Sequence, residues 1–449
     1  DLLSYDAKAT YEGIAKLNRA WTYYQLVRQY GDVPFINTVV NTADEEILYG
    51  PRINRDVVMD SVLNDLNYAA EHITQTNKQR FTADMALAMK ADVALYEGTY
   101  CKYRTVADNA GKGPDLTRAQ RFLNECADAC TKLMTKDYHL NASYKGNYNS
   151  TDLSKNPEMI FYKPYSKGKL THSTINYTMN TSGTNGMTKD AFDAYLFLDG
   201  KPKATTSLAT NDAATLNANN QYGIEAQLAV RDKRLAETID PVLAFKGHAY
   251  QRAGTHAFTS TTGYAVSKYD NTTELTIDER NNNNRQYTDC PIFWLSVVYL
   301  DYAEAKAELG TITQTDLDNS INKLQIRAGL PGIQLAPAAD PANNMGVSNL
   351  LWEIRRARRC ELMFDNWTRY WDLIRWHQLH LIDSEQHPNV YLGANISNVP
   401  NPEVDVNSNG YMIGSNTLNQ VRRFDKKYYF YPIPTGQITL SNLTQNPGW

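Results

Sequence analysis

Four arginines crowd one stretch near residue 357 and form the densest set of chemically capable side chains in the sequence: Arg355, Arg356, Arg358 and Arg359. Guanidinium groups pair with carboxylates and sulfates, so this cluster could bind an anionic ligand. Acidic residues of neighbouring predicted helices offer internal partners: Asp301, Glu304, Glu361, Asp365 and Asp372. Charges spaced along helices pair with one another more often than they bind a ligand. We therefore predict a structural ion-pair network.

Two carboxylates, Glu361 and Asp365, stand where one helix face would bring them together. Glycoside hydrolysis needs two carboxylates that face each other across a cleft, about 5–9.5 Å apart, and not side by side on one helix. The sequence also lacks Gly-x-Ser-x-Gly, His-Glu-x-x-His, a phosphate-binding loop and a dinucleotide fingerprint. We predict no catalytic residues and no enzyme activity.

Histidine and cysteine offer few ligands for a metal. His377 and His380 stand three residues apart, but a zinc site needs a further protein ligand, and none can be identified in the sequence. The five cysteines are scattered, and Cys126 and Cys130 have helical spacing. Because free cysteine is most often a buried, inert thiol, the sequence predicts no metal site and no cofactor.

Aromatic residues are abundant for so polar a chain, with thirty Tyr and seven Trp at a mean hydropathy of −0.53. Many tyrosines outside the predicted helices stand in stretches rich in asparagine: Tyr144, Tyr148, Tyr162, Tyr165, Tyr177, Tyr250, Tyr264 and Tyr269, with Asn176, Asn180 and Asn185. Tyrosine rings stack on the C–H faces of pyranoses, and amides bridge sugar hydroxyls. Large aromatics also dominate protein cores, so we expect most of these tyrosines to pack internally and a minority to contact a ligand.

Charge and hydropathy exclude two classes of partner. Forty-five basic residues against forty-nine acidic ones give a net charge of −4, which supplies no basic field to hold nucleic acid. The sequence contains no apolar run of about 18 residues, which is the length that could span a bilayer. The sequence opens at Asp1 without a signal peptide or a lipid-bearing cysteine, which leaves two interpretations: a cytosolic protein, or a mature fragment whose export signals have been removed.

Apolar residues recur every three or four positions in two blocks, which predicts an all-α protein. The predicted helices cover residues 14–30, 55–73, 83–103, 117–136, 295–309, 317–328 and 348–381, and they group into four pairs over 14–73, 83–136, 293–329 and 348–381. Helix pairs with a period of about 34 residues are typical of tetratricopeptide repeats, which bury a continuous core only when stacked. We expect a tetratricopeptide-like helix-pair superhelix with long irregular loop regions and little β-structure.

The organisation predicted from this pattern is a single unit of residues 1–449 with three segments. Residues 14–136 form the N-terminal helix pairs, and residues 291–449 form the C-terminal helix pairs and a closing segment. Residues 137–290 are rich in Asn, Thr, Gly and Tyr and show little helical period. Such stretches usually lie over a scaffold as loops, strands and small helices, so we expect them to form the ligand face.

Four short segments resemble the SusD/RagB family. The closing segment matches best, with Tyr-Tyr-Phe-Tyr-Pro-Ile-Pro at 428–434 and Gln-Asn-Pro-Gly-Trp at 445–449. The helix over 350–362 and its continuation to Trp376 is similar to the family's Glu-Leu and Asp-Leu-Arg-Trp signature, with Ala357 in place of the usual Glu. The remaining matches are Arg19-Ala20 with Tyr-Gly-Asp-Val-Pro-Phe at 30–35, and Tyr-Leu-Asp-Tyr-Ala-Glu-Ala at 299–305.

The resemblance implies a non-catalytic lipoprotein on the cell surface of Bacteroidetes, anchored in the outer membrane by an N-terminal lipid absent from this chain. Such proteins bind oligosaccharide or polysaccharide and deliver it to a SusC-type TonB-dependent transporter. In the family, glycan contacts come in part from the loop after the second repeat, which corresponds to residues 161–187. We therefore predict Tyr165, His172, Tyr177 and Asn185 as ligand-binding residues; Met187 stands where an aromatic platform would be expected.

Three other functions stay open at this point. One is an oligopeptide-capturing member of the same family. A second is a glycoside hydrolase on a helical scaffold, and a third is a helical-repeat adaptor whose partners are proteins only.

Overall fold

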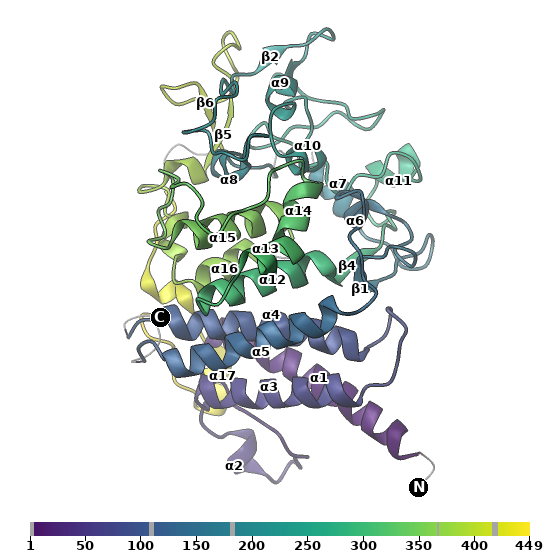
Figure 1. The fold of residues 1–449 in the computed structure, drawn as a ribbon, viewed down its shortest axis with the longest axis vertical. Helices are drawn as coiled ribbons and strands as arrows, with labels where there is room; N and C mark the ends of the chain where they lie inside the picture. Colours follow the sequence, from purple (N-terminus) through teal and green to yellow (C-terminus); the bar gives the residue numbers. More distant parts are fainter. Residues whose placement is uncertain (1–3, 107–111, 180–184, 366–367, 415–420) are drawn as a thin grey trace.

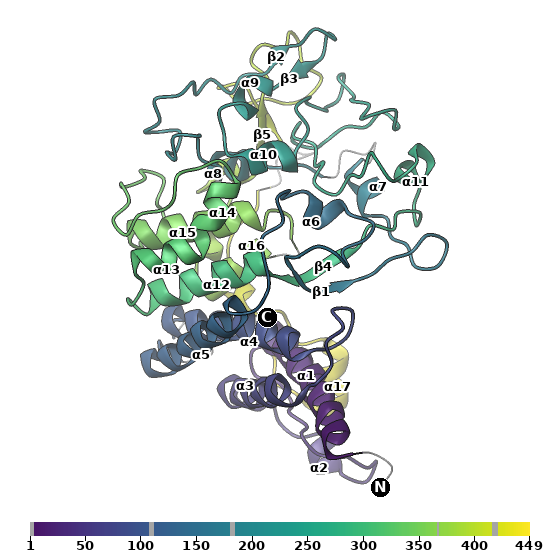
Figure 2. The same cartoon turned by 45° about the vertical axis from the view of Figure 1, so that its right-hand side comes forward.

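The computed structural model of the chain describes residues 4–106, 112–179, 185–365, 368–414 and 421–449. Its fold is mainly helical, as the sequence predicts. The N-terminal helices occupy the lower part of Figure 1, the C-terminal helices lie above them, and irregular segments with short strands cover the top and one side (Figures 1 and 2).

The N-terminal block consists of two packed helix pairs. Helix α1 (Tyr5–Tyr30) packs against α3 (Arg55–His72), and α4 (Ala83–Tyr103) packs against α5 (Leu116–Met134). A short helix, α2 (Glu45–Leu48), lies in the connection between α1 and α3. Both predicted pairs of this block are therefore confirmed.

Helix α1 begins at Tyr5, well before the predicted start at residue 14. The Ser4 hydroxyl accepts a hydrogen bond from the amide of Ala7 and caps the helix. Tyr5 and Tyr11 in these extra turns are exposed, so the turns add no apolar stripe that a sequence pattern could reveal. The helix ends at Gly31, whose φ of 73° is a left-handed conformation that suits glycine.

Helix α4 lies at the centre of the N-terminal block and has the predicted bounds. Thr82 caps it by accepting a hydrogen bond from the amide of Met85 at 3.0 Å. The helix is buried on nearly every side, including its small residues: Ala86, Ala88, Ala91, Ala94 and Gly98. Small side chains let neighbouring helices approach closely, which explains how α4 can be surrounded.

The C-terminal block contains α12 (Leu295–Glu308), α13 (Gln314–Asn319), α14 (Ile321–Arg327), α15 (Asn349–Glu361) and α16 (Thr368–Arg375), with a 3-10 turn at Leu379–Ile382. Helix α12 packs against both α5 and α15 and so joins the two blocks. One hydrophobic core runs through both of them.

Two predicted helices of this block are interrupted. The one over 317–328 is split at Ser320, whose φ of −129° and ψ of −103° are not helical and whose hydroxyl donates to the carbonyl of Asp316. The one over 348–381 breaks after Glu361, where Phe364 adopts a left-handed backbone. Leu362 and Met363 beside the second break are good helix formers, so neither propensity nor the apolar period could reveal it. Beside the first break, Asn319 and Ser320 are weaker helix formers, but the apolar period continues through them.

The segment between the blocks holds short elements: α6 (Gly146–Asn149), α7 (Thr174–Thr178), α8 (Lys189–Ala194), α9 (Glu225–Leu228), α10 (Lys233–Thr238) and α11 (Ile277–Asn281). Strands form two-stranded antiparallel sheets, in which β1 (Met159–Lys163) pairs with β4 (Cys290–Trp294), β2 (Thr215–Leu216) with β3 (Tyr222–Gly223), and β5 (Leu392–Asn395) with β6 (Tyr411–Ile413). Further 3-10 turns cover Pro388–Val390 and Lys426–Tyr429.

The closing segment returns to the N-terminal helices, with α17 (Thr435–Ser441) beside α1 (Figures 1 and 2). The amide of Tyr431 donates to the carbonyl of Gln29 at 2.7 Å, and the Asn446 side chain donates to the carbonyl of Tyr30 at 3.1 Å. The closing segment is thus fastened to the C-terminal end of α1. The division of the unit into three functional segments stays a prediction.

Candidate ligand-binding site

Two of the four predicted ligand residues lie together at one cavity of about 600 Å³. Tyr177 stands on α7 with 65% of its surface exposed. The side-chain amide of Asn185 donates to the backbone carbonyl of Tyr177 at 2.5 Å, which fixes the two residues relative to each other. The cavity is lined by Ser173, Thr174, Tyr177, Thr178, Asn185, Gly186, Val266, Tyr269 and Phe364.

The other two predicted residues, Tyr165 and His172, pack against each other and do not line this cavity. Their rings meet edge to face with centroids 4.7 Å apart. The Nδ1 atom of His172 accepts from the amide of Thr174, so its Nε2–H donates to the carbonyl of Thr288 at 3.0 Å. Burial lowers the pKa of His172, which fits a neutral ring with this tautomer. The pair supports the segment that enters α7.

Most of the other candidate tyrosines are packing residues, as expected. Tyr144, Tyr148, Tyr162 and Tyr264 are at most 4% exposed and belong to the cores. Tyr269 is the member of the set that reaches the cavity beside Tyr177. Asn180 and residues 183–184 of the turn lie outside the described residues, and Met187 is fully buried in a core cluster.

Aromatic rings and neutral polar groups make up the wall of the smaller cavity. Tyr177, Tyr269 and Phe364 supply the rings, while Ser173, Thr174, Thr178 and Asn185 supply hydroxyl and amide groups. The described residues that line it carry no formal charge. Rings flanked by hydroxyl and amide groups suit a neutral polar ligand that has apolar faces of its own.

Phe364 was missed by the sequence analysis because the residues around it fit a continuous helix. Its place in the break after α15 makes its ring, 39% exposed, available at the cavity. Val266 and the hydroxyls of Ser173 and Thr178 were also missed, since nothing in their local sequence distinguishes them from ordinary loop residues.

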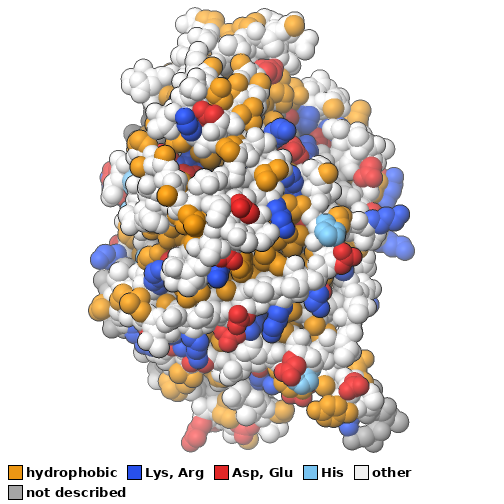
Figure 3. All heavy atoms as spheres, viewed as in Figure 1, with side chains coloured by type: hydrophobic (Ala, Val, Ile, Leu, Met, Phe, Trp, Pro, Cys, Tyr) orange, Lys and Arg blue, Asp and Glu red, His pale blue; other side chains and the backbone are white. Residues whose placement is uncertain are grey.

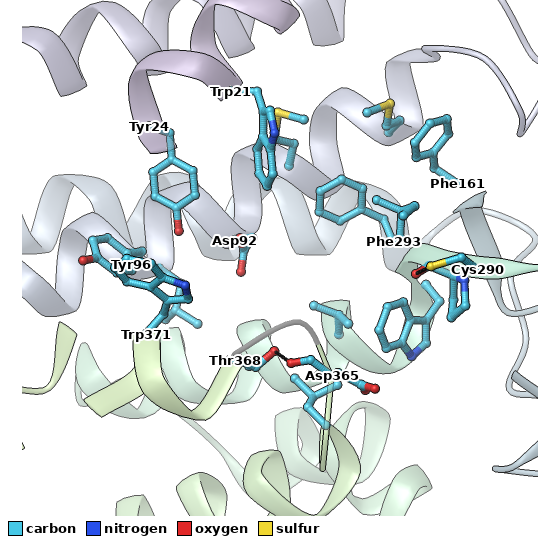
Figure 4. A pocket seen from close by; sticks show the side chains of 18 of the residues that line it. Trp21, Tyr24, Asp92, Tyr96, Phe161, Cys290, Phe293, Asp365, Thr368 and Trp371 are labelled. Carbon is cyan, nitrogen blue, oxygen red and sulfur yellow. Dashed lines mark hydrogen bonds between the residues drawn. The ribbon is translucent and has the colours of Figure 1, made fainter. Parts of the chain in front are cut away.

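A second cavity, of about 650 Å³, lies between the N-terminal and C-terminal helices. Figure 4 shows Tyr24, Tyr96 and Trp371 at one side of it and Phe161 at the other, with Trp21 and Phe293 between them. Aromatic rings thus form part of the wall, and charged side chains such as Asp372 and Arg375 also line it. It shares Thr174 and Tyr269 with the smaller cavity. The two cavities therefore adjoin across the Tyr269 ring.

Asp92 is an acidic group at the wall of this larger cavity. Its nearest ion-pair partner among the described residues is Arg358, at 4.0 Å. Burial raises the pKa of the Asp92 carboxyl despite the opposing charges of Arg358, Arg28 and Arg375. Arg28 is held over the rings of Trp371 and Tyr24, with its guanidinium carbon 4.2 and 5.0 Å from the two centroids.

The arginine cluster on α15 is structural, as predicted. Arg358 pairs with Asp301 at 2.6 Å and with Asp372 at 3.0 Å, and both acids were among the expected partners. The other three arginines use acids outside the expected set: Arg355 pairs with Glu308, Arg356 with Asp340 and Arg359 with Asp190. Buried guanidinium groups need such partners because an unpaired buried charge is very costly.

The two acids considered for hydrolysis are also held by internal partners. Glu361 pairs with Arg234 at 2.9 Å and with Arg327, and it lines neither cavity. Asp365 pairs with Lys268 at 2.7 Å and accepts from the Tyr148 hydroxyl at 2.9 Å. Neither acid faces the other across a cleft, which is the arrangement that glycoside hydrolysis needs.

Among the described residues, one group of carboxylate and thiol atoms is close enough to suggest a metal site, namely Asp56, Glu97 and Cys101. Guanidinium groups already pair with its carboxylates: Arg104 with Asp56 at 2.8 Å, and Arg55 with Glu97 at 2.6 Å. Arg118 also lies 3.1 Å from Glu97, so three arginines contact this group. Their positive charges oppose the binding of a cation. This cluster is therefore an ion-pair network.

Glu304 makes the buried network sensitive to acid. It is fully buried, and it accepts hydrogen bonds from Arg375 at 2.6 and 2.7 Å and from the Trp376 indole at 2.6 Å. Burial alone would raise the pKa of Glu304, but the charge and hydrogen bonds of Arg375, with the charge of Arg358, lower it to about 2.

We expect the contribution of Glu304 to stability to disappear in acid. Because the folded-state pKa lies below the unfolded value of about 4.3, this contribution is complete above about pH 5 and is lost as the pH falls towards 2. Urea unfolding of the wild type and of Glu304→Gln between pH 7 and pH 3 measures it. The difference in the free energy of unfolding should be constant near neutrality and shrink below about pH 4.5; a constant difference over the whole range would contradict the assignment.

The surface agrees with the predicted lack of a basic field. On the face in Figure 3, Lys and Arg side chains are interspersed with Asp and Glu among uncharged groups. Within the described ranges, none of the helices is both long enough and apolar enough to cross a membrane.

Comparisons with known proteins agree with the resemblance. Residues 141–449 match the SusD family, and residues 3–95 match a family described as starch-binding and associating with the outer membrane. SusD-like protein P2 of Formosa agariphila is 38% identical over 78 residues, which cover 17% of this chain and 14% of that relative. The whole relative is thus far longer than the part that aligns.

Solved structures share the fold at low identity. A SusD-like carbohydrate-binding protein of Bacteroides fragilis has a TM-score of 0.70 and 20% identity, over 97% of this chain and 80% of that one. A laminarin-binding SusD-like protein has a TM-score of 0.55 and 17% identity, over 100% of this chain and 80% of that one. These likenesses concern the fold, whereas the family match covers more than half of the sequence. The chain therefore belongs to the SusD family.

Proposed function

We propose that the protein captures an oligosaccharide at the cell surface without catalysis, in the cavity lined by Tyr177, Tyr269 and Phe364. The observation that carries this proposal is the combination of three rings with hydroxyl and amide groups in one uncharged cavity. Stacking and hydroxyl hydrogen bonds of modest strength hold the sugar, and modest affinity permits fast release. The family is generally one of non-catalytic binding proteins.

Isothermal titration against a panel of neutral oligosaccharides tests the proposal. We expect Tyr177→Ala to weaken binding of the responding glycan about 5- to 30-fold, because an exposed stacking ring contributes about 1–2 kcal/mol. Tyr5→Ala is the matched control, since it removes another exposed tyrosine, at the far N-terminal end of α1. Absence of binding at millimolar glycan, or an equal loss in both variants, would overturn the proposal.

The adjoining aromatic cavity favours a second candidate function, the capture of an oligopeptide. A wall that includes Trp21, Phe161 and Phe293 suits apolar side chains better than hydroxyl-rich sugars. Mass spectrometry of ligands that copurify with the protein separates the two candidates. Peptides recovered with the protein, together with no glycan binding in the titrations, would favour this second function.

Delivery to a partner completes the proposed function. We propose that a SusC-type TonB-dependent transporter receives the ligand, and that an N-terminal lipid anchors the protein in the outer membrane. Support comes from the family itself and from the match to a family that associates with the outer membrane. Copurification with an outer-membrane barrel tests this step; recovery of cytosolic partners alone would favour the helical-repeat adaptor.

A further inference from the structure

The turn after α15 holds an aromatic residue in an unusual backbone conformation. Phe364 has a φ of 67°, in the left-handed region that bulky L-residues rarely adopt. Such a conformation persists only where the surrounding structure over-determines it, and it is often found at ligand sites. The ring of Phe364 is 39% exposed and lines the smaller cavity.

Side chains from two distant segments hold the backbone of this turn. The Tyr144 hydroxyl donates to the carbonyl of Glu361 at 3.0 Å. The Lys268 ammonium donates to the carbonyl of Met363 at 2.7 Å, and the Tyr269 hydroxyl donates to the carbonyl of Phe364 at 2.8 Å. These three bonds fix the path of the chain on both sides of the left-handed residue.

All the contacts described for the Lys268 ammonium are with this turn or with a ring packed against it. It is fully buried, and besides Met363 it contacts Asp365, with Nζ 2.7 Å from Oδ1. Its ammonium also lies 3.5 Å from the centroid of the Tyr148 ring, whose hydroxyl donates to the other oxygen of Asp365. Two oxygens and one ring face thus satisfy the three N–H groups of the ammonium.

Tyr269 connects the hydrogen bonds that hold this turn to the wall of the smaller cavity. Its ring lines both cavities, while its hydroxyl holds the carbonyl of Phe364. The two rings are therefore fixed relative to each other by one hydrogen bond and by the lysine next in sequence. A ring pre-positioned in this way loses no freedom when a ligand stacks on it, which favours binding.

We propose that Phe364 is a ligand-stacking residue, and that Lys268 and the Tyr269 hydroxyl are positioning residues that hold its ring in the cavity. This proposal rests on the proposed function. It adds a contact from the C-terminal block to a site otherwise built from the irregular segment.

A double-mutant cycle tests the coupling. With a glycan that binds the wild type, we expect about 5-fold weaker binding for Tyr269→Phe, which keeps the ring and removes only the hydroxyl, and about 10-fold for Phe364→Ala. The double variant should bind no more weakly than Phe364→Ala, because the hydroxyl acts through the missing ring. If the losses of affinity in the two single variants multiply in the double variant, the proposal is overturned. Tyr411→Phe, which loses hydrogen bonds to Asp212 outside both cavity walls, should leave affinity unchanged.

A second measurement needs no ligand and keeps this proposal separate from the proposed function. We expect 4-fluorophenylalanine at position 364 to give one sharp fluorine resonance in the wild type. Tyr269→Phe, and separately the Lys268→Met/Asp365→Asn pair, should shift and broaden it in protein whose helical circular dichroism is retained. An unchanged resonance in both would overturn the positioning role, whereas failure of the wild type to bind any glycan would overturn the proposed function.

Discussion

Replacing Glu304 with alanine is expected to lower the free energy of unfolding by about 3–5 kcal/mol, the usual cost of removing one partner of a buried ion pair. Glu304 is fully buried on α12 and receives three hydrogen bonds from Arg375 and Trp376. Its removal leaves the Arg375 guanidinium with Asp372 as its remaining acidic partner and the Trp376 indole N–H without an acceptor. Leaving such groups buried costs more than the bonds themselves contribute.

Urea denaturation followed by circular dichroism measures the effect at neutral pH. The matched control is Glu12→Ala, which removes a glutamate whose side chain is 56% exposed and whose ion pair with Lys16 spans one helical turn. We expect this change to cost less than about 0.5 kcal/mol, because exposed ion pairs contribute little. A loss of less than about 1 kcal/mol for Glu304→Ala would contradict a structural role for the buried network.

Gly98→Val is expected to destabilise the protein by about 3 kcal/mol or to prevent folding, because it overpacks the contact between α4 and α5. A Cβ atom at Gly98 would lie 2.8 Å from Cγ and 3.1 Å from the backbone nitrogen of Leu123. The nitrogen belongs to the rigid backbone of α5, so it cannot move aside as the end of a flexible side chain could. The helices must therefore separate at the centre of the N-terminal block.

Gly436→Ala provides the matched control for the second change. Gly436 lies in α17, and no atom would lie within 4 Å of an added Cβ. Alanine is a better helix former than glycine, so we expect a gain of about 0.5–1 kcal/mol. Thermal unfolding of both variants measures the contrast, and a Gly98→Val protein as stable as the wild type would show that the two helices can separate without cost.

The helical scaffold was largely predictable from the sequence because its signals are local. Helix α4 has the predicted bounds, and α3 and α12 end within a residue of their predicted ends. Their apolar residues recur at helical spacing, and turn or capping residues stand at their ends. The apolar period continues through the breaks at Ser320 and after Glu361, so it could not reveal them, although Asn319 and Ser320 are weaker helix formers.

The candidate ligand site was predictable only in part. Tyr177 and Asn185 reach the cavity, whereas Tyr165 and His172 pack together behind it. Nothing in the composition around Tyr148 distinguishes it from Tyr177, yet one is buried and the other is exposed. Burial depends on which distant segment covers each ring, and that information is not carried by the neighbours in sequence.

The sequence by itself determined the helix pairs of the N-terminal block and the family, because periodic apolar residues and short motifs act over a few residues. It also indicated that the arginine cluster is structural, although partners such as Glu308 and Asp190 lie 47 and 169 residues away in sequence. The tertiary structure alone decided that Tyr177, Tyr269 and Phe364 share a cavity. These residues are far apart in sequence, and the left-handed backbone that presents Phe364 is held by contacts from Tyr144, Lys268 and Tyr269. Such contacts form only when the chain has folded, so no local pattern could encode them.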